Sequence, residues 1–149
     1  MDQLTVLLAK LIIHESNMRC LHWLVKGSEF DNSHSGFTTS YYEMISNDID
    51  YVAECLMRND KDVLNYEEAL EIAREENSSM IDSDKKYASV EAAQICNQIF
   101  SSILLSLEAV LESTDIKDNI KNVGIRSSLE SMYERYDKEK RFLNKRRLL

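Results

Sequence analysis

The sequence predicts an all-α fold, a four-helix bundle in which one long crossover joins the second and third helices. The chain of 149 residues contains no proline and only three glycines, which favours long uninterrupted helices. Apolar residues recur at three- and four-residue steps, and one connector is much longer than the others. With 44% hydrophobic residues the chain can bury one core, so we expect a single domain over residues 1–149.

The N-terminal third predicts two helices. Apolar residues at helical spacing run from residue 4 to residue 25 and indicate an amphipathic helix that ends near Gly27. Residues 27–36 form a loop by composition, and a second helical pattern follows over residues 37–58. We expect His14, on the first helix, to be a packed, hydrogen-bonded side chain.

The C-terminal half predicts two more helices. Residues 90–111 have the strongest apolar periodicity in the chain, and Ser89 is placed to be the N-cap of this helix. A fourth helix is expected to begin after Thr114 or Asp115 and to continue toward Phe142.

The connector between the second and third helices spans residues 59–88 and contains a short helical pattern at residues 66–74. Asn65 is its expected N-cap, with Glu68 at the third helical position. Helices of about 20 residues are about 30 Å long, so this connector can return the chain along the bundle and let its two neighbours run parallel. This arrangement is the ferritin-like bundle with one crossover.

Four residues form the candidate metal site: His22, His34, Asp50 and Glu54. The two carboxylates are four residues apart on a helix, so they project from one face and can bind a cation together. Imidazole nitrogen with carboxylate oxygen suits iron, manganese or zinc. A solvated polar helix face has the same carboxylate spacing, so this pattern alone leaves both interpretations open.

The string LHWLVKGSEFDNSHSGF, with a second histidine twelve residues after the first, resembles the signature of the Dps family of miniferritins. Asp50, Ala53 and Glu54 match the DxxAE of that family on the second helix. The specific likeness covers residues 22–54, while the length, the crossover and the aromatic Phe142 extend it over the chain.

The resemblance implies a ferroxidase subunit of a hollow cytoplasmic cage, a homododecamer that oxidises Fe²⁺ to Fe³⁺, preferably with peroxide. The ferric oxide is stored inside, which protects DNA from oxidative damage. It further implies that His22 and His34 come from one subunit and Asp50 and Glu54 from its two-fold partner, with Trp23 as an oxidisable neighbour. A site shared between subunits agrees with the absence of any Glu-x-x-His motif, since the bundle-centred di-iron site uses that motif.

The sequence departs from the family in two ways. Family members place an acidic ligand about one turn after the second histidine, whereas residues 37–39 are Phe-Thr-Thr. A compensating carboxylate would have to come from Asp31 or Asp48. The interval from His34 to Asp50 is one residue longer than in the family, which corresponds to about 100° of regular helix unless a bulge near Gly36 absorbs it.

Charge is unevenly distributed along the chain. Residues 138–149 have six basic residues and one acidic residue, so they carry +5 and leave −13 for the rest of a chain whose net charge is −8. The acidic part favours cations, and Asp115 and Asp118 either line an iron-entry pore or only interact with the dipole at the start of the last helix. The basic end is either an exposed last turn or a DNA contact, so the alternative function is a shell with impaired ferroxidase that acts in DNA binding or as a structural assembly.

No membrane segment is expected, because the apolar stretch at residues 6–13 is far shorter than the roughly 20 residues that span a bilayer. No secretory signal is expected either, since the first residues include the acidic Asp2 instead of the basic residues with which a signal peptide begins. Three distant cysteines favour reduced thiols, which fits the cytoplasm.

Overall fold

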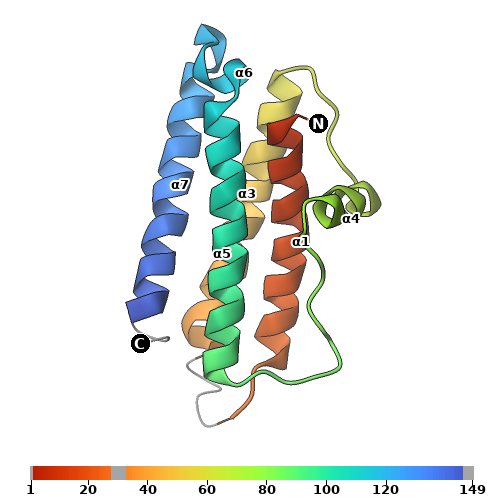
Figure 1. Ribbon diagram of the computed structural model, residues 1–149, viewed down its shortest axis with the longest axis vertical. Coiled ribbons are helices and arrows are strands. Elements are labelled where there is room, and N and C mark those ends of the chain that lie inside the picture. The colour runs from red at the N-terminus through yellow and green to blue at the C-terminus, as the bar shows by residue number, and fades with distance from the viewer. Residues whose placement is uncertain (1, 28–32, 146–149) are drawn as a thin grey trace.

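The computed structural model describes residues 2–27 and 33–145, most of which are helical (Figure 1). The long helices are α1 (Gln3–Leu24), α3 (Thr39–Arg58), α5 (Ser89–Glu112) and α7 (Val123–Leu143). The shorter segments are the π-helical turn η1 (His34–Thr38), α4 (Tyr66–Glu75), α6 (Thr114–Lys117) and the 3-10 turn η2 (Ile120–Asn122). The described residues contain no strand beyond one isolated bridge, so the predicted all-α bundle is confirmed.

The four long helices run along one axis, and the crossover returns the chain from one end of the bundle to the other (Figure 1). As a result α3 and α5 run parallel, while α1 and α7 run in the opposite direction. The short helix α4 packs against α1 on the outside of the bundle. This is the ferritin-like topology that the length of the connector predicts.

The prediction that Asn65 is the N-cap of the short helix α4 is confirmed. Asn65 Oδ1 accepts a hydrogen bond from the Glu68 amide at 2.9 Å, and Glu68 Oε1 accepts one from the Asn65 amide at 3.0 Å. The two residues therefore satisfy each other's backbone groups at the start of α4. Ala69 and Ala73 of α4 pack against Ala9 of α1, and these small side chains let the two helices approach closely.

The end of the crossover is fastened to the end of α1 by a short parallel bridge between Val25 and Tyr87. The Tyr87 amide donates to the Leu24 carbonyl at 2.9 Å, and the Lys26 amide donates to the Tyr87 carbonyl at 2.9 Å. Gly27 follows with φ of +97°, a conformation that side chains disfavour. The helix therefore ends at Leu24, slightly before the position expected from the sequence.

The buried side chains of the four long helices form one main core. Tyr41 of α3, Phe100 of α5 and Tyr136 of α7 meet edge to face through this core, with ring centroids 4.7 and 5.6 Å apart. Among the described helices, α5 alone is long and apolar enough to cross a membrane, but most of its apolar side chains pack in this core. That burial is typical of the central helix of a bundle.

Two details of the predicted helices are wrong. Ala88, not Ser89, is the N-cap residue of α5, and the Ser89 hydroxyl instead accepts a hydrogen bond from Ser33 at 2.9 Å. The fourth helix is not continuous from residue 114, because α6 ends after one turn and α7 begins only at Val123. Asn119 interrupts the helix, since its side chain accepts from the Lys121 amide at 3.2 Å.

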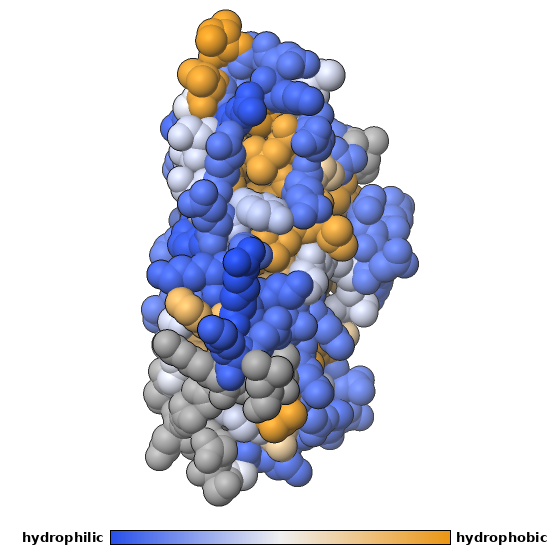
Figure 2. Space-filling view, turned by 60° about the vertical axis from the view of Figure 1, so that its left-hand side comes forward, coloured by the Kyte–Doolittle hydropathy of each residue, from blue (hydrophilic) through white to orange (hydrophobic). Residues whose placement is uncertain are grey.

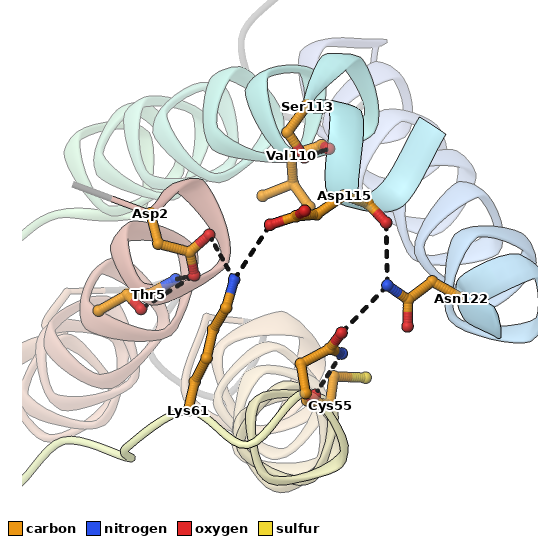
Figure 3. Close-up of polar contacts among 9 residues, drawn as sticks. Asp2, Thr5, Cys55, Lys61, Val110, Ser113, Asp115 and Asn122 are labelled. Carbon is orange, nitrogen blue, oxygen red and sulfur yellow. Dashed lines mark hydrogen bonds and ion pairs between the residues drawn. The ribbon is translucent and has the colours of Figure 1, made fainter. Parts of the chain in front are cut away.

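Polar contacts hold the ends of four segments together at this end of the bundle (Figure 3). Lys61 Nζ lies 3.0 Å from a carboxylate oxygen of Asp2 and 3.3 Å from one of Asp115. Asn122 donates to the Asp115 carbonyl at 2.9 Å and to the Asn59 side chain at 3.1 Å. The carboxylate of Asp115, a candidate pore residue, is therefore engaged by a lysine of its own chain.

The outer surface around α7 is mainly hydrophilic (Figure 2). Apolar atoms collect at the end where α6 and η2 lead into α7, and Ile120 and Val123 from these segments are 83% and 60% exposed. Among the cysteines, Cys55 and Cys96 are buried and Cys20 is partly buried. Burial raises the pKa of the Cys55 and Cys96 thiols.

His14 is a buried side chain with one hydrogen bond, as expected. Its Nε2 lies 3.1 Å from Ser102 Oγ, which in turn lies 3.2 Å from Ser78 Oγ, while its Nδ1 has no hydrogen-bond partner among the described residues. Burial, with a smaller contribution from the charge of Lys10, lowers the pKa of His14 to about 4. The ring is therefore neutral in the folded protein at any pH well above 4.

Acid should weaken the fold through His14. An unfolded histidine binds a proton near pH 6.5 and the folded ring only near 4, so the stabilisation is complete above about 6.5 and is lost as the pH falls toward 4, by up to about 3 kcal/mol. Urea unfolding of the wild type and of His14→Gln at pH 7, 5 and 4 measures this. The stability difference between the two proteins should change with pH, and a constant difference would contradict the assignment.

Candidate metal centre

The last turn of α1 and the turn η1 bring the two candidate histidines together. His22 is 8% exposed and His34 is half-buried. Their rings stack with centroids 3.7 Å apart and planes inclined by 14°. Tyr42 of α3 lies with its ring edge to face against His22 at 5.2 Å, so the pair is held from the α3 side as well.

The turn η1 lies between His34 and Asp50, where the family resemblance leads us to expect one extra residue. A π-helical turn contains one residue more than the corresponding turn of an α-helix. The bulge that the sequence required near Gly36 therefore takes the form of a π-helical turn over His34–Thr38, after which α3 continues as a regular helix. The extra residue is absorbed before the helix reaches its carboxylates.

Each ring has an identified partner on its Nδ1 side. His34 Nδ1 lies 2.8 Å from the backbone carbonyl oxygen of His22, which can only accept, so the neutral His34 ring carries its proton on Nδ1. His22 Nδ1 lies 2.9 Å from Thr38 Oγ1 and 3.4 Å from Thr39 Oγ1. These contacts orient both rings through atoms of the same chain.

The surroundings of His22 favour its neutral form. Burial of the ring, and then the charge that His34 would carry, lower the pKa of His22. A neutral imidazole is the form that binds a metal ion through its lone pair. The lowered pKa of His22 therefore favours the protonation state that a metal ligand requires.

Asp50 and Glu54 are not grouped with the two histidines in the described part of the chain. Both are exposed on α3, one helical turn apart, and Met57 on the same face is 64% exposed. Within residues 2–27 and 33–145, no three His, Cys, Asp or Glu side chains come close enough to hold a metal ion together. The structure thus brings together His22 and His34, and it leaves the two carboxylates exposed on the surface of α3.

Asp48 does not replace the missing acidic ligand, because its carboxylate accepts hydrogen bonds from side chains of α7. Arg135 donates to its two oxygens at 2.9 and 3.1 Å, and the Tyr136 hydroxyl donates at 2.7 Å. Asp48 is 5% exposed, and this desolvated contact joins α3 to α7. The other candidate, Asp31, lies outside the described residues.

The sequence did not reveal the role of Thr38. It is one of the three residues, 37–39, among which the family resemblance leads us to expect a carboxylate, and the sequence shows only that none is present. In the structure Thr38 is fully buried and its hydroxyl contacts the His22 ring. The available signal was its spacing, four residues after His34, which places a hydroxyl one turn away on the same side of a helix.

Comparisons with solved structures support the fold. No family model and no curated sequence matches the chain. Helicobacter cinaedi CAIP aligns with a TM-score of 0.83 at 18% identity, over 97% of this chain and 96% of its own. Dps from Staphylococcus aureus aligns at 0.80 with 21% identity, over 96% and 91%. Antigen TpF1 from Treponema pallidum aligns at 0.81 with 19% identity, over 96% and 87%. The chain therefore has the Dps-type miniferritin fold.

Removing the Asp48 carboxylate should destabilise the protein. Asp48→Ala leaves Arg135 and Tyr136 without their acceptor, and a loss of about 2–4 kcal/mol in the free energy of unfolding is expected. Urea denaturation measures the change. Asn47→Ala, an exposed neighbour on the same helix, should change stability by less than about 0.5 kcal/mol, and an equal effect of both substitutions would refute the assignment.

Proposed function

We propose that the protein is a subunit of a cytoplasmic shell, a homododecamer, that binds Fe²⁺ at sites between subunits, oxidises it with peroxide in preference to dioxygen, and stores the ferric oxide. His22, His34, Asp50 and Glu54 are the proposed iron ligands. The Dps-type fold and the family signature support this proposal. Its main support is the stacked pair of His22 and His34, in which each ring has its Nδ1 atom engaged within the chain.

The donor atoms fit iron. Imidazole nitrogen binds ferrous iron well, and carboxylate oxygen favours the ferric product because its negative charge stabilises the higher cation charge. A histidine whose Nδ1 atom is held by a hydrogen bond presents its other nitrogen in a fixed direction. The two histidines therefore supply an oriented half of a site, and the carboxylates supply the charge that this half lacks.

The exposed position of Asp50 and Glu54 supports a site shared between subunits. One subunit has two imidazoles with no third ligand beside them in the described residues, and two carboxylates that face outward. A two-fold axis that places α3 of one copy against the histidines of another would complete two identical sites. The exposed Met57, beside Glu54 on α3, supplies apolar surface for such a contact.

In the proposed reaction, two ferrous ions each give one electron to one molecule of peroxide. The O–O bond breaks, and two protons are taken up to give two molecules of water. The ferric ions then hydrolyse to an oxide-hydroxide and release protons. Iron supplies the electrons, while the protein binds the ions, holds them close together and offers an acidic environment in which ferric oxide can collect.

Peroxide consumed in this way does not generate hydroxyl radicals, which is the proposed basis for protecting DNA. Direct DNA contact through the basic C-terminal segment is a further part of the proposal, and residues 146–149 of that segment lie outside the described residues. Within the described part, Arg141 pairs with Asp137 at 3.0 Å and Lys138 lies over the Phe142 ring. The ion pair of Arg141 reduces the positive charge available to bind phosphate.

The alternative function is a shell with impaired ferroxidase that binds DNA or serves as a structural assembly. The observation that favours it is the threonine at position 38, because a neutral hydroxyl replaces a carboxylate beside the histidines. The site would then carry one negative charge fewer and would bind ferrous iron more weakly. Measurement of iron oxidation separates the two functions.

Wild-type protein should oxidise ferrous iron at least about tenfold faster than His34→Ala combined with Glu54→Ala, since the double variant loses one ligand of each kind. The protein is loaded with Fe²⁺ without oxygen, peroxide is added, and the ferric absorbance is followed. Glu43→Ala, an exposed carboxylate on α3 outside the proposed site, is the matched control and should oxidise iron at the wild-type rate. Equal rates for the wild type, the double variant and buffer would favour the alternative.

A shared site should also show complementation between defective subunits. His22→Ala with His34→Ala removes one half of the site, and Asp50→Ala with Glu54→Ala removes the other. When the two are coexpressed, random pairing should restore about a quarter of the wild-type sites, because each mixed pair contains one intact site and one empty one. Iron-oxidation rates of the mixed and separate proteins test this, and a mixed sample as inactive as its parents would place the site within one subunit.

A further inference from the structure

Thr38 lies at the centre of the hydrogen bonds around the two histidines. Its side chain is fully buried at the end of the turn η1. Its Oγ1 lies 2.6 Å from the Ser33 carbonyl oxygen, 2.9 Å from the His34 carbonyl oxygen and 2.9 Å from His22 Nδ1. One hydroxyl therefore faces two carbonyl oxygens and one ring nitrogen.

The positions of the protons follow from these three contacts. A hydroxyl group has one hydrogen, and a carbonyl oxygen can only accept. The Thr38 hydrogen therefore points to a carbonyl, and the shorter contact is the one to Ser33. Thr38 Oγ1 must then accept from His22, so the His22 proton is on Nδ1 and the ring lone pair is on Nε2.

The opposite tautomer is unfavourable at this position. With its proton on Nε2, His22 would need a hydrogen bond from Thr38, and the Thr38 hydroxyl would then face both carbonyl oxygens without a hydrogen. The carbonyl of Ser33 would lie 2.6 Å from another oxygen lone pair. Thr39 offers no relief, because its own hydroxyl already donates to the His34 carbonyl at 2.7 Å.

The same contacts connect the two histidines to each other. His22 donates to Thr38, Thr38 lies within hydrogen-bonding distance of the His34 carbonyl, and the His34 side chain donates to the His22 carbonyl. The π-helical turn makes this possible because it brings the Ser33 and His34 carbonyls beside the hydroxyl of Thr38. Both imidazoles are therefore held in the same tautomer, with Nδ1 protonated.

We propose that Thr38 is the positioning residue of the metal centre: its hydroxyl fixes His22 as the Nδ1-protonated tautomer and so directs the Nε2 lone pair to the metal ion. This inference rests on the proposed function for the identity of the ligands. It adds that the residue at position 38, which is not an acid, contributes a hydroxyl oxygen. This oxygen accepts the hydrogen bond that orients His22, and it does not bind the metal itself.

The tautomer of His22 can be measured without any metal. The chain has only three histidines, so protein labelled with ¹⁵N and ¹³C in histidine alone gives few ring signals, and solid-state NMR reads them whatever the size of the assembly. His14→Gln removes one set and aids assignment. The wild type should show His22 protonated on Nδ1, and Thr38→Ser should retain this state. Thr38→Val should shift His22 toward the Nε2-protonated form.

Metal affinity provides the second measurement. Co²⁺ binds imidazole and carboxylate donors and can be titrated by its visible absorption. Thr38→Val should weaken Co²⁺ binding by about 10- to 100-fold, the usual effect of removing the hydrogen-bond partner of a ligand. Thr38→Ser should restore wild-type affinity, and Thr39→Val, which lies at the longer contact, should bind Co²⁺ like the wild type.

The outcomes distinguish this inference from the proposed function. A wild-type His22 protonated on Nε2, or a Thr38→Val variant with unchanged tautomer and affinity, would overturn the role of Thr38 whatever the iron-oxidation rate. An Nδ1-protonated His22 that responds to Thr38 in a protein without iron oxidation would support the positioning role and reject the ferroxidase. If Thr38→Val does not fold, the wild-type tautomer and the comparison with Thr38→Ser decide.

Discussion

An α-helix leaves its last carbonyl groups without partners inside the helix. At the end of α1, these carbonyl groups accept hydrogen bonds from other segments of the chain. The Leu21 carbonyl accepts from the Val25 amide at 3.1 Å, the His22 carbonyl accepts from the His34 ring at 2.8 Å, and the Leu24 carbonyl accepts from the Tyr87 amide at 2.9 Å. The end of α1 thus holds the turn before α3 and the end of the crossover. Neighbouring carbonyl groups of one helix therefore bind both a histidine of the candidate metal centre and the end of the crossover.

The π-helical turn reconciles the extra residue with the packing of α3. An additional residue in a regular helix would rotate everything after it by about 100° and move apolar side chains out of the core. Because the extra residue is confined to His34–Thr38, α3 keeps Ile45, Val52 and Leu56 in the core, and Asp50 and Glu54 remain on the outer face. The same turn brings two carbonyl groups to Thr38. A local departure from α-helical geometry therefore serves both the packing and the orientation of His22.

The sequence predicted the features that depend on local chemistry. The four long helices follow from apolar periodicity, and the start of α4 follows from Asn65 and Glu68. The break between α6 and α7 was missed, because it depends on side-chain hydrogen bonds of Asn119 and Asn122 that compete with the helix and leave no mark on the apolar pattern. The pairing of His22 with His34 was expected from the family signature, whereas the role of Thr38 arises only when the turn is folded. The contribution of Asp50 and Glu54 stays a prediction, since it depends on a second subunit.

The burial of two thiols has a consequence for the durability of a protein proposed to consume peroxide. The thiolate, rather than the thiol, is the form that peroxide attacks, and burial raises the pKa of Cys55 and Cys96, so these residues stay protonated and shielded. Cys96 lies 3.5 Å from the sulfur of Met18, so the core contains two oxidisable sulfur atoms in contact. Their protection means that repeated turnover would damage the surface of the subunit before its core. Trp23, which is 63% exposed beside His22, and Met57, which is 64% exposed on α3, are oxidisable side chains on that surface.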